Sequence, residues 1–168
     1  MDREALREAQ RPLKERYRAD PAAALVTLRA TGALDEGVSC SVQTGQAIAA
    51  AGLHPASGGD GSLLCSGDML LEALAACAGV TLRAVATSLE IEIPEGAVHV
   101  EGDLDFRGTL GVDREAPVGF RAIRIRFDLE TDASREELDT LLRLTERYCV
   151  VYQTLALAPK ISITGVTR

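Results

Sequence analysis

The segment from Asp68 to about Ser88 constrains the fold of this chain more than any other, because it is apolar on almost every side. Its apolar residues do not keep to one helical stripe, as they would in a surface helix; they are Met69, Leu70, Leu71, Ala73, Leu74, Ala75, Ala76, Val80, Leu82 and Val85. A helix that is apolar all round has to be buried all round. In a chain of 168 residues this predicts a central helix with a sheet on one side and something else, such as a second subunit, on the other.

The flanks and charges of this segment argue against a membrane span. Ser66 or Asp68 is placed to cap the helix, and an acid there suits the positive end of the helix dipole. Glu72 and Arg83 interrupt the apolar run. The N-terminus is charged from its first residues and has no apolar signal-peptide core. The net charge of −7 also argues against nucleic acids and anionic membranes as partners. We therefore expect a cytoplasmic protein with no nucleic-acid partner and no membrane partner.

Two later segments have the alternation of half-exposed strands. In residues 98–107 and again in 123–130, apolar residues alternate with charged ones, which predicts antiparallel strands joined by the Gly108–Gly119 loop. Earlier in the chain, residues 24–30 and 38–44 are short β-prone runs around a turn at Gly32–Gly37, which predicts a hairpin. The glycine-rich residues 52–61 predict a loop.

The remaining elements complete an α+β domain. A capping box at Ser134–Glu137 starts one helix, and a second short helix is expected from about Cys149 until Pro159 closes it. Residues 161–166 predict a final strand. Residues 3–18 predict a surface helix, so we divide the chain into an N-terminal extension, 1–20, and a single domain, 21–168. The expected class is α+β, with helices on one face of an antiparallel sheet.

The chain has four cysteines, which are too few for a disulfide scaffold, and neither histidine lies at metal-ligand spacing from one. No metal site is expected. Cys77 lies in the central helix among small residues that let a ligand approach its sulfur, although a buried core cysteine explains the same position. Cys149 lies where a helix begins, and free backbone N–H groups there lower a thiol pKa; an inert cysteine at a helix junction is the alternative. We interpret Cys40 and Cys65 as structural.

Both cysteines lie in stretches that resemble one known family. The run SGDMLLEALAACAGVTLRAVATSLEI at residues 66–91, followed by TERYCVVYQTLALAPKISI at residues 145–163, resembles the OsmC/Ohr family of peroxidases. The family pattern has one cysteine in a buried central helix and a second that opens a helix far downstream, usually within Cys-Pro-Val or Cys-Val-Val. The order of elements agrees over roughly residues 22–168. The resemblance implies antiparallel sheets wrapped around buried central helices in an intertwined homodimer.

The resemblance also implies a chemistry. Cys77 would attack a hydroperoxide and become a sulfenic acid, and Cys149 would resolve it as a disulfide. A dithiol reductant, such as a lipoyl protein, would restore the pair, and no cofactor would be required. The apolar residues around the helical cysteine favour an organic hydroperoxide as substrate.

The sequence departs from the family pattern where the thiolate is activated. Well-known members carry a glutamate ten residues before the first cysteine, paired with an arginine near the first hairpin. Here that position is Gly67, with Asp68 beside it, and Arg29 lies just before the first turn. Asp68 and Arg29 are therefore the candidate activating residues. The same departure leaves two alternatives open on this fold: a non-catalytic thiol or small-molecule binding module, and a redox sensor.

Overall fold

The computed structural model describes residues 2–5, 7–8, 10–11, 19, 31–34, 39–43, 48–111 and 113–165. The elements are β1 (Thr31–Leu34), β2 (Ser39–Gln43), β3 (Ile48–Gly52), the short 3-10 helix η2 (Pro55–Ser57), β4 (Leu64–Cys65), α2 (Ser66–Leu89), β5 (Gly96–Leu104), α3 (Phe106–Thr109), β6 (Phe120–Leu129), α4 (Arg135–Tyr148) and α5 (Val150–Ala156). Helices and strands are mixed along the chain, as the α+β prediction requires.

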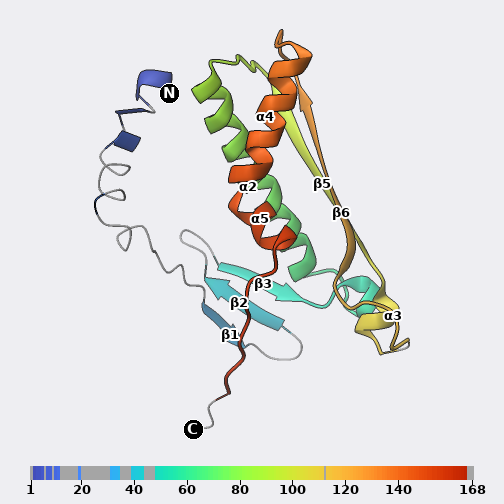
Figure 1. The fold of residues 1–168 in the computed structure, drawn as a ribbon. Coiled ribbons are helices and arrows are strands. Elements are labelled where there is room, and N and C mark those ends of the chain that lie inside the picture. The colour runs from blue at the N-terminus through green and yellow to red at the C-terminus, as the bar shows by residue number, and fades with distance from the viewer. Residues whose placement is uncertain are drawn as a thin grey trace.

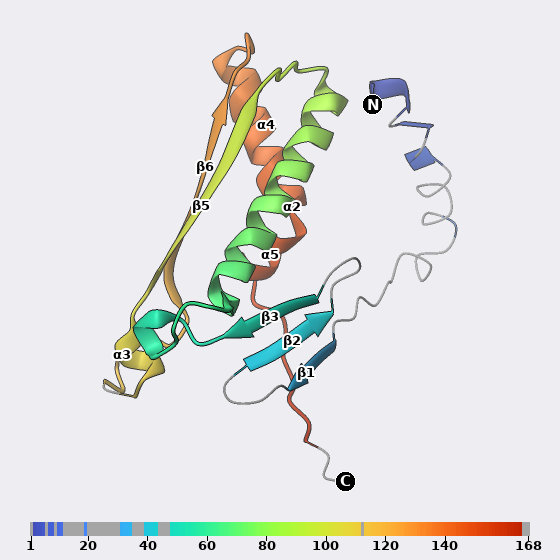
Figure 2. The same ribbon diagram turned by 180° about the vertical axis from the view of Figure 1, so that it is seen from behind.

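The helices cover one face of the longer sheet. Helix α2 contacts β5, α4 and α5, and α4 and α5 follow one another along its length (Figure 1). Strands β5 and β6 form an antiparallel pair on the other side of these helices. A second sheet, in the order β1-β2-β3-β4, lies at the beginning of α2, because β4 leads directly into that helix (Figure 2).

Helix α2 confirms the predicted central helix, with a different start. Its N-cap residue is Cys65, which makes no side-chain capping hydrogen bond, so the prediction that Ser66 or Asp68 caps the helix is wrong. Both residues lie inside the first turn, where the acid still suits the helix dipole. The helix ends at Leu89, and the left-handed backbone of Glu90 (φ 62°) turns the chain so that the N–H of Ile91 donates to the carbonyl of Ala86 at 3.0 Å.

A single chain buries only one side of α2. The buried positions are Leu74, Ala78, Leu82, Val85 and Ala86, whereas Val80 is 73% exposed. By length and composition alone α2 is apolar enough to cross a membrane. The buried side packs against α4, α5 and β5, however, as the core helix of a soluble domain does. Among the described residues, little covers the side of the helix that carries Val80.

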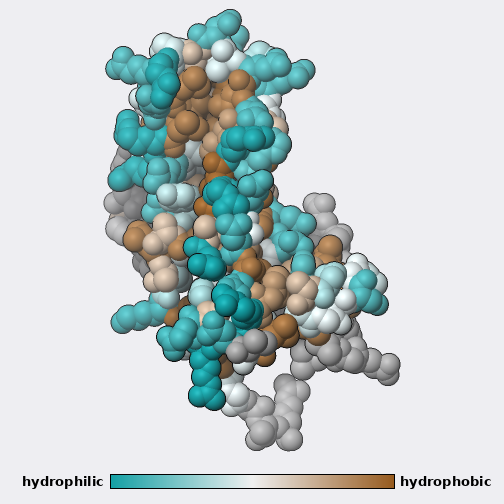
Figure 3. Space-filling view, turned by 90° about the vertical axis from the view of Figure 1, so that its right-hand side faces the viewer, coloured by the Kyte–Doolittle hydropathy of each residue, from teal (hydrophilic) through white to brown (hydrophobic). Residues whose placement is uncertain are grey.

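Strands β5 and β6 confirm the predicted alternation. Val98 pairs with Phe127 and Val100 with Ile125, so that apolar side chains share the face toward α2. Arg124 on the outer face forms ion pairs with Glu101 and Asp103 of the opposite strand. Figure 3, which faces the right-hand side of Figure 1, shows patches of apolar surface among hydrophilic residues.

The end of β5 corrects the prediction for residues 98–107. Phe106 and Arg107 begin α3 instead of continuing the strand, because the Asp105 carboxylate accepts the backbone N–H of Arg107 and caps a short helix. Hydrogen bonding from the Arg107 side chain to the Asp105 carboxylate lowers the pKa of that carboxyl to about 2.

The predicted first hairpin is shifted along the chain. Residues 31–34, which include part of the predicted turn, form β1 and pair with β2 through Thr31↔Gln43 and Leu34↔Cys40. Strand β3 was not predicted, because its alanine-rich sequence has low β-propensity and only its backbone pairing with β2 makes it a strand. The predicted strand at 24–30 lies outside the described residues.

The predictions for the two ends of the chain have different outcomes. The described residues within 3–11 are helical, and Arg3 forms an ion pair with Glu90 at the end of α2. The rest of the predicted 3–18 helix lies outside the described residues. Residues 161–165 form no strand, which corrects that prediction: the described chain pairs no neighbouring strand with them, and Ile161 and Ile163 are almost fully exposed.

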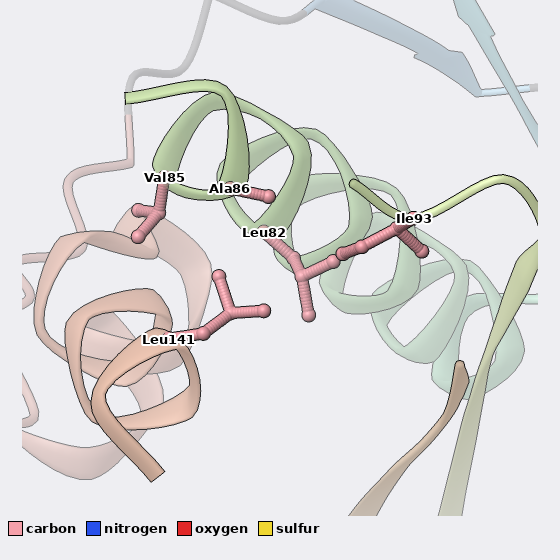
Figure 4. Packing of buried hydrophobic residues seen from close by; sticks show 5 residues of the cluster. All are labelled: Leu82, Val85, Ala86, Ile93 and Leu141. Atoms are coloured by element: carbon pink, nitrogen blue, oxygen red, sulfur yellow. The ribbon is translucent and has the colours of Figure 1, made fainter. Parts of the chain in front are cut away.

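One buried cluster fixes α4 against α2. Leu82, Val85 and Ala86 of α2 meet Ile93 and Leu141 in a close apolar contact (Figure 4). The predicted capping box is present at the start of α4, where Ser134 and Glu137 bond each other's backbone N–H groups. The capping box thus fixes the start of α4, and Leu141 fixes its packing on α2.

We predict that Leu141→Ala lowers the free energy of unfolding by about 2–5 kcal/mol, because Leu141 is completely buried and truncation leaves a cavity. The matched control is Leu142→Ala, since Leu142 is 39% exposed and should cost much less. Urea unfolding followed by circular dichroism measures both. Equal losses at the two positions would contradict the described packing of α4 on α2.

Candidate active site

Two helical segments bring Cys77 and Cys149 together. Cys77 lies in the middle of α2, and Cys149 is the single residue between α4 and α5. Cys149 is buried with Leu74 and Ala78, and Cys77 packs against this cluster from the same helix. The sequence-predicted cysteine pair is therefore one local site, although 72 residues separate its members in the sequence.

The backbone at Cys149 is fixed from both sides. Its N–H donates to the carbonyl of Thr145 at 2.9 Å, and its carbonyl accepts the N–H of Gln153 at 2.9 Å. Its extended conformation (φ −73°, ψ 108°) breaks the helix at one residue and starts α5 in a new direction. The first N–H groups of α5 have no partner within the helix, and they are free to bind another group.

These free N–H groups reach Cys77. Burial by itself raises the pKa of the Cys77 thiol. The backbone N–H groups of Val151 and Val150, the Cys149 thiol and the Thr81 hydroxyl lie where they favour the thiolate, and together they outweigh burial. The pKa of Cys77 is consequently lowered, and each of these stabilising groups is an uncharged donor.

Cys149 behaves in the opposite way. Its burial raises the pKa of its thiol, and its position beside the Cys77 thiolate raises it further, while the N–H groups of Tyr152 and Val151 only partly compensate. The prediction that the start of α5 lowers the pKa of Cys149 is therefore wrong. The Val151 N–H favours both thiolates, whereas the Val150 N–H acts on Cys77 and the Tyr152 N–H on Cys149. Cys149 remains the weaker acid because a second negative charge beside the Cys77 thiolate is costly.

Neither predicted activating residue joins the pair within the described chain. Asp68 is exposed in the first turn of α2, nine residues before Cys77. Nine residues place it about 13.5 Å along the helix axis and on the opposite side of the helix. Arg29 lies outside the described residues.

The groups that sequence reasoning missed are Thr81 and the N–H groups of Val150 and Val151. Thr81 follows Cys77 by four residues on the same face of α2, so helical spacing alone is enough to find it. The two N–H groups are free because they lie in the first turn of a predicted helix. Their direction depends on the angle between α4 and α5, which the sequence pattern does not specify.

Two hollows border the site on different sides. A cavity of about 230 Å³ reaches Cys149, and its lining is mainly apolar: Ala78, Ile125, Phe127, Leu142, Thr145, Glu146, Cys149 and Tyr152. A larger groove of about 770 Å³ runs along α2 past Thr81, Ala84 and Ser88. Cys77 is half-buried and lies one helical turn before Thr81, but it lines neither of these two hollows, whereas Cys149 lines the smaller one.

The other cysteines stand apart from the pair. Cys65 is a free thiol at the start of α2, twelve residues before Cys77 and thus about 18 Å away along the helix. Cys40 lies in β2, opposite Ala51 of β3. Within the part of the chain that the structure describes, no group of three His, Cys, Asp or Glu side chains is placed to hold a metal ion.

We predict that Cys77 titrates below the ordinary range of a thiol and Cys149 above it, so alkylation of Cys77 reaches its plateau at the lower pH. Thr81→Val should raise the pKa of Cys77, because it removes one donor and keeps the shape of the side chain. Thr81→Ser, which keeps the hydroxyl, is the control. Thiolate absorbance at 240 nm against pH measures all three proteins. If Thr81→Val and Thr81→Ser titrate alike, the hydroxyl does not stabilise the thiolate.

Comparison with known proteins places this arrangement in context. A family model described as OsmC-like protein matches residues 59–164, which include both cysteines and more than half of the chain. No match was found among curated proteins.

Solved structures share the fold at low sequence identity. An OsmC-like protein from Mycoplasma pneumoniae is 21% identical, with 79% of this chain and 89% of that chain covered and a TM-score of 0.67. An organic hydroperoxide resistance protein from Elizabethkingia anophelis is 15% identical (80% and 91% covered, TM-score 0.64). A third, an organic hydroperoxide resistance protein OsmC from Legionella pneumophila, is 17% identical (78% and 90% covered, TM-score 0.61). These similarities confirm the predicted fold; the intertwined homodimer stays a prediction.

Proposed function

Because the chain belongs to the OsmC-like protein family, we propose that it is a thiol-dependent peroxidase that reduces organic hydroperoxides. The observation that carries this proposal is the contact between two thiols of opposite character, Cys77 with a lowered pKa and Cys149 with a raised one. A thiolate is the nucleophilic form of cysteine, and a neighbouring thiol protects its oxidised product from further oxidation.

The pKa order assigns the two roles. The Cys77 thiolate attacks the terminal oxygen of the hydroperoxide, the O–O bond breaks, and the leaving alkoxide takes up a proton to become an alcohol. Cys77 is then a sulfenic acid. Cys149 loses its proton as its sulfur attacks Cys77, the S–O bond breaks, and water leaves. One hydroperoxide and two thiols thus give one alcohol, one water and a disulfide, which an external dithiol such as a lipoyl protein reduces again.

The surroundings of the pair favour an organic substrate. The side chains packed around Cys149 and Cys77 are chiefly Leu, Ala, Val, Ile and Phe, and such a lining attracts an alkyl chain more than it attracts hydrogen peroxide. Structural relatives from Elizabethkingia anophelis and Bacillus subtilis are named organic hydroperoxide resistance proteins. A reducing cytoplasm, the location we propose, would keep both thiols available for turnover.

We predict that reduced protein mixed with cumene hydroperoxide forms a Cys77–Cys149 disulfide rapidly and with one disulfide per chain, as measured by mass spectrometry after alkylation. Cys77→Ser should abolish peroxide consumption. Cys149→Ser should instead accumulate a sulfenic acid on Cys77 that dimedone traps, since the attacking thiol is intact and the resolving one is lost. Two thiols that stay reduced at excess peroxide would leave a thiol or small-molecule binding module as the better reading.

The second part of the proposal is a homodimer. Helix α2 is apolar all round, yet Val80 on it is 73% exposed in one chain. Beyond α5, Ile161 and Ile163 are 83% and 96% exposed in a segment that pairs with no strand of the described chain. Exposed apolar surface of this kind marks an interaction site, and a second copy of the chain offers the matching surface.

We predict that the protein is a dimer by light scattering and that Val80→Glu shifts it toward the monomer, because a carboxylate would have to be buried without a partner. Val118→Glu is the matched control, since Val118 is comparably exposed at 63% but lies in the loop before β6. A monomeric wild-type protein, or equal effects of the two substitutions, would refute the use of α2 as the interface.

A further inference from the structure

The cavity beside Cys149 distinguishes the two sulfurs of the pair. Cys149 lines this cavity of about 230 Å³, and Cys77 is not among its lining residues. Cys149 is only 1% exposed to solvent, and this hollow is a space that it borders. Leu142, which is 39% exposed, forms part of the lining and is the most open apolar side chain there.

We propose that the reductant enters this cavity and attacks Cys149, so that the mixed disulfide forms on Cys149 and Cys77 is the sulfur that leaves. The proposal rests on the proposed function, because it concerns the disulfide which that reaction produces. The cavity is the expected entrance for a slender, uncharged dithiol, and the sulfur of Cys149 is the atom that it attacks.

The chemistry balances with the dithiol as the only co-reactant. One thiolate of the dithiol attacks the sulfur of Cys149, the Cys77–Cys149 bond breaks, and Cys77 departs as a thiolate. The second thiol of the reductant then attacks its own sulfur in the mixed disulfide. Cys149 leaves and takes up a proton, and the dithiol becomes a cyclic disulfide. The N–H groups at the start of α5 receive the departing Cys77 thiolate, which favours this direction of cleavage.

The cavity also carries a polar group without a partner. The hydroxyl oxygen of Thr145 is buried and makes no hydrogen bond among the described residues, although Thr145 lines the cavity and its carbonyl already holds the Cys149 N–H. An unsatisfied buried hydroxyl is costly, and a thiol or amide group of an entering molecule would satisfy it.

The charge of the lining selects among reductants. Glu146 is the charged residue of the described lining, and its carboxylate accepts the Tyr152 hydroxyl at 2.9 Å. Its negative charge disfavours an anionic reductant such as glutathione near the sulfur. A neutral dithiol of small cross-section, free or on a flexible arm, fits both the apolar walls and this charge.

The attacked sulfur can be identified directly. Protein oxidised with diamide, which requires no peroxide, is treated with 2-mercaptoethanol, quenched with N-ethylmaleimide and digested with trypsin. Cleavage after Arg147 and Lys160 isolates Cys149 in residues 148–160, whereas Cys77 falls in residues 30–83. We expect the mercaptoethanol adduct on residues 148–160 and N-ethylmaleimide on Cys77, which peptide fragmentation distinguishes from Cys40 and Cys65 in residues 30–83. An adduct chiefly on Cys77 overturns the proposal.

The rate at which the disulfide is reduced tests whether the reductant enters through this cavity. Leu142→Trp should slow the reduction of the diamide-formed disulfide by dithiothreitol several-fold, because the larger ring fills the cavity mouth. Leu155→Trp is the control, since Leu155 is similarly exposed at 38% but does not line the cavity. Circular dichroism confirms that both variants are folded. Equal reduction rates in the two variants overturn the proposal.

The two proposals fail separately. If diamide forms the disulfide but cumene hydroperoxide does not, the peroxidase reaction is wrong while the route of reduction can still be read from the adduct. If peroxide forms the disulfide and the adduct lies on Cys77, the peroxidase reaction is supported, and the proposed attack on Cys149 through the cavity is wrong.

Discussion

The site depends on one interaction, that of the first N–H groups of α5 with the sulfur of Cys77. A thiol in the middle of an apolar helix resists ionisation, because burial removes the water that would stabilise its charge. Here a second helix ends at Tyr148, the chain turns at Cys149, and the next helix directs its first free N–H groups at that sulfur. The packing of α4 on α2 matters to function because it sets this direction.

The same interaction makes the two thiols unequal. A negative charge on Cys77 makes a second charge on Cys149 unfavourable, and the burial of Cys149 raises the pKa of its thiol as well. In the proposed cycle this inequality is used twice. Cys77 is the better nucleophile toward peroxide, and it is also the better leaving group when the disulfide is reduced.

Sequence patterns predicted the elements that depend on local rules. The apolar run of α2, the capping box of α4 and the alternation of β5 and β6 all fix an element within a few residues, and each is present. The first hairpin was misplaced, because backbone pairing decides it and the side chains of β3 give no strand signal. The cysteine pair was found, but its activation was not: it depends on where the N–H groups of α5 point, which is a matter of tertiary geometry. The sequence pattern also does not say what covers the exposed side of α2, because burial there would depend on a second chain.

The most direct test of this site is the pKa of Cys77 in Val150→Pro. Val150 is the first residue of α5, where proline is favoured, and the extended Cys149 before it accepts a following proline. The substitution therefore removes one N–H donor and leaves the helix in place, while Val150→Ala keeps the donor. If the start of α5 holds the thiolate, Cys77 titrates at a higher pH in the proline variant than in the alanine variant. Identical titrations in the two variants would contradict that role.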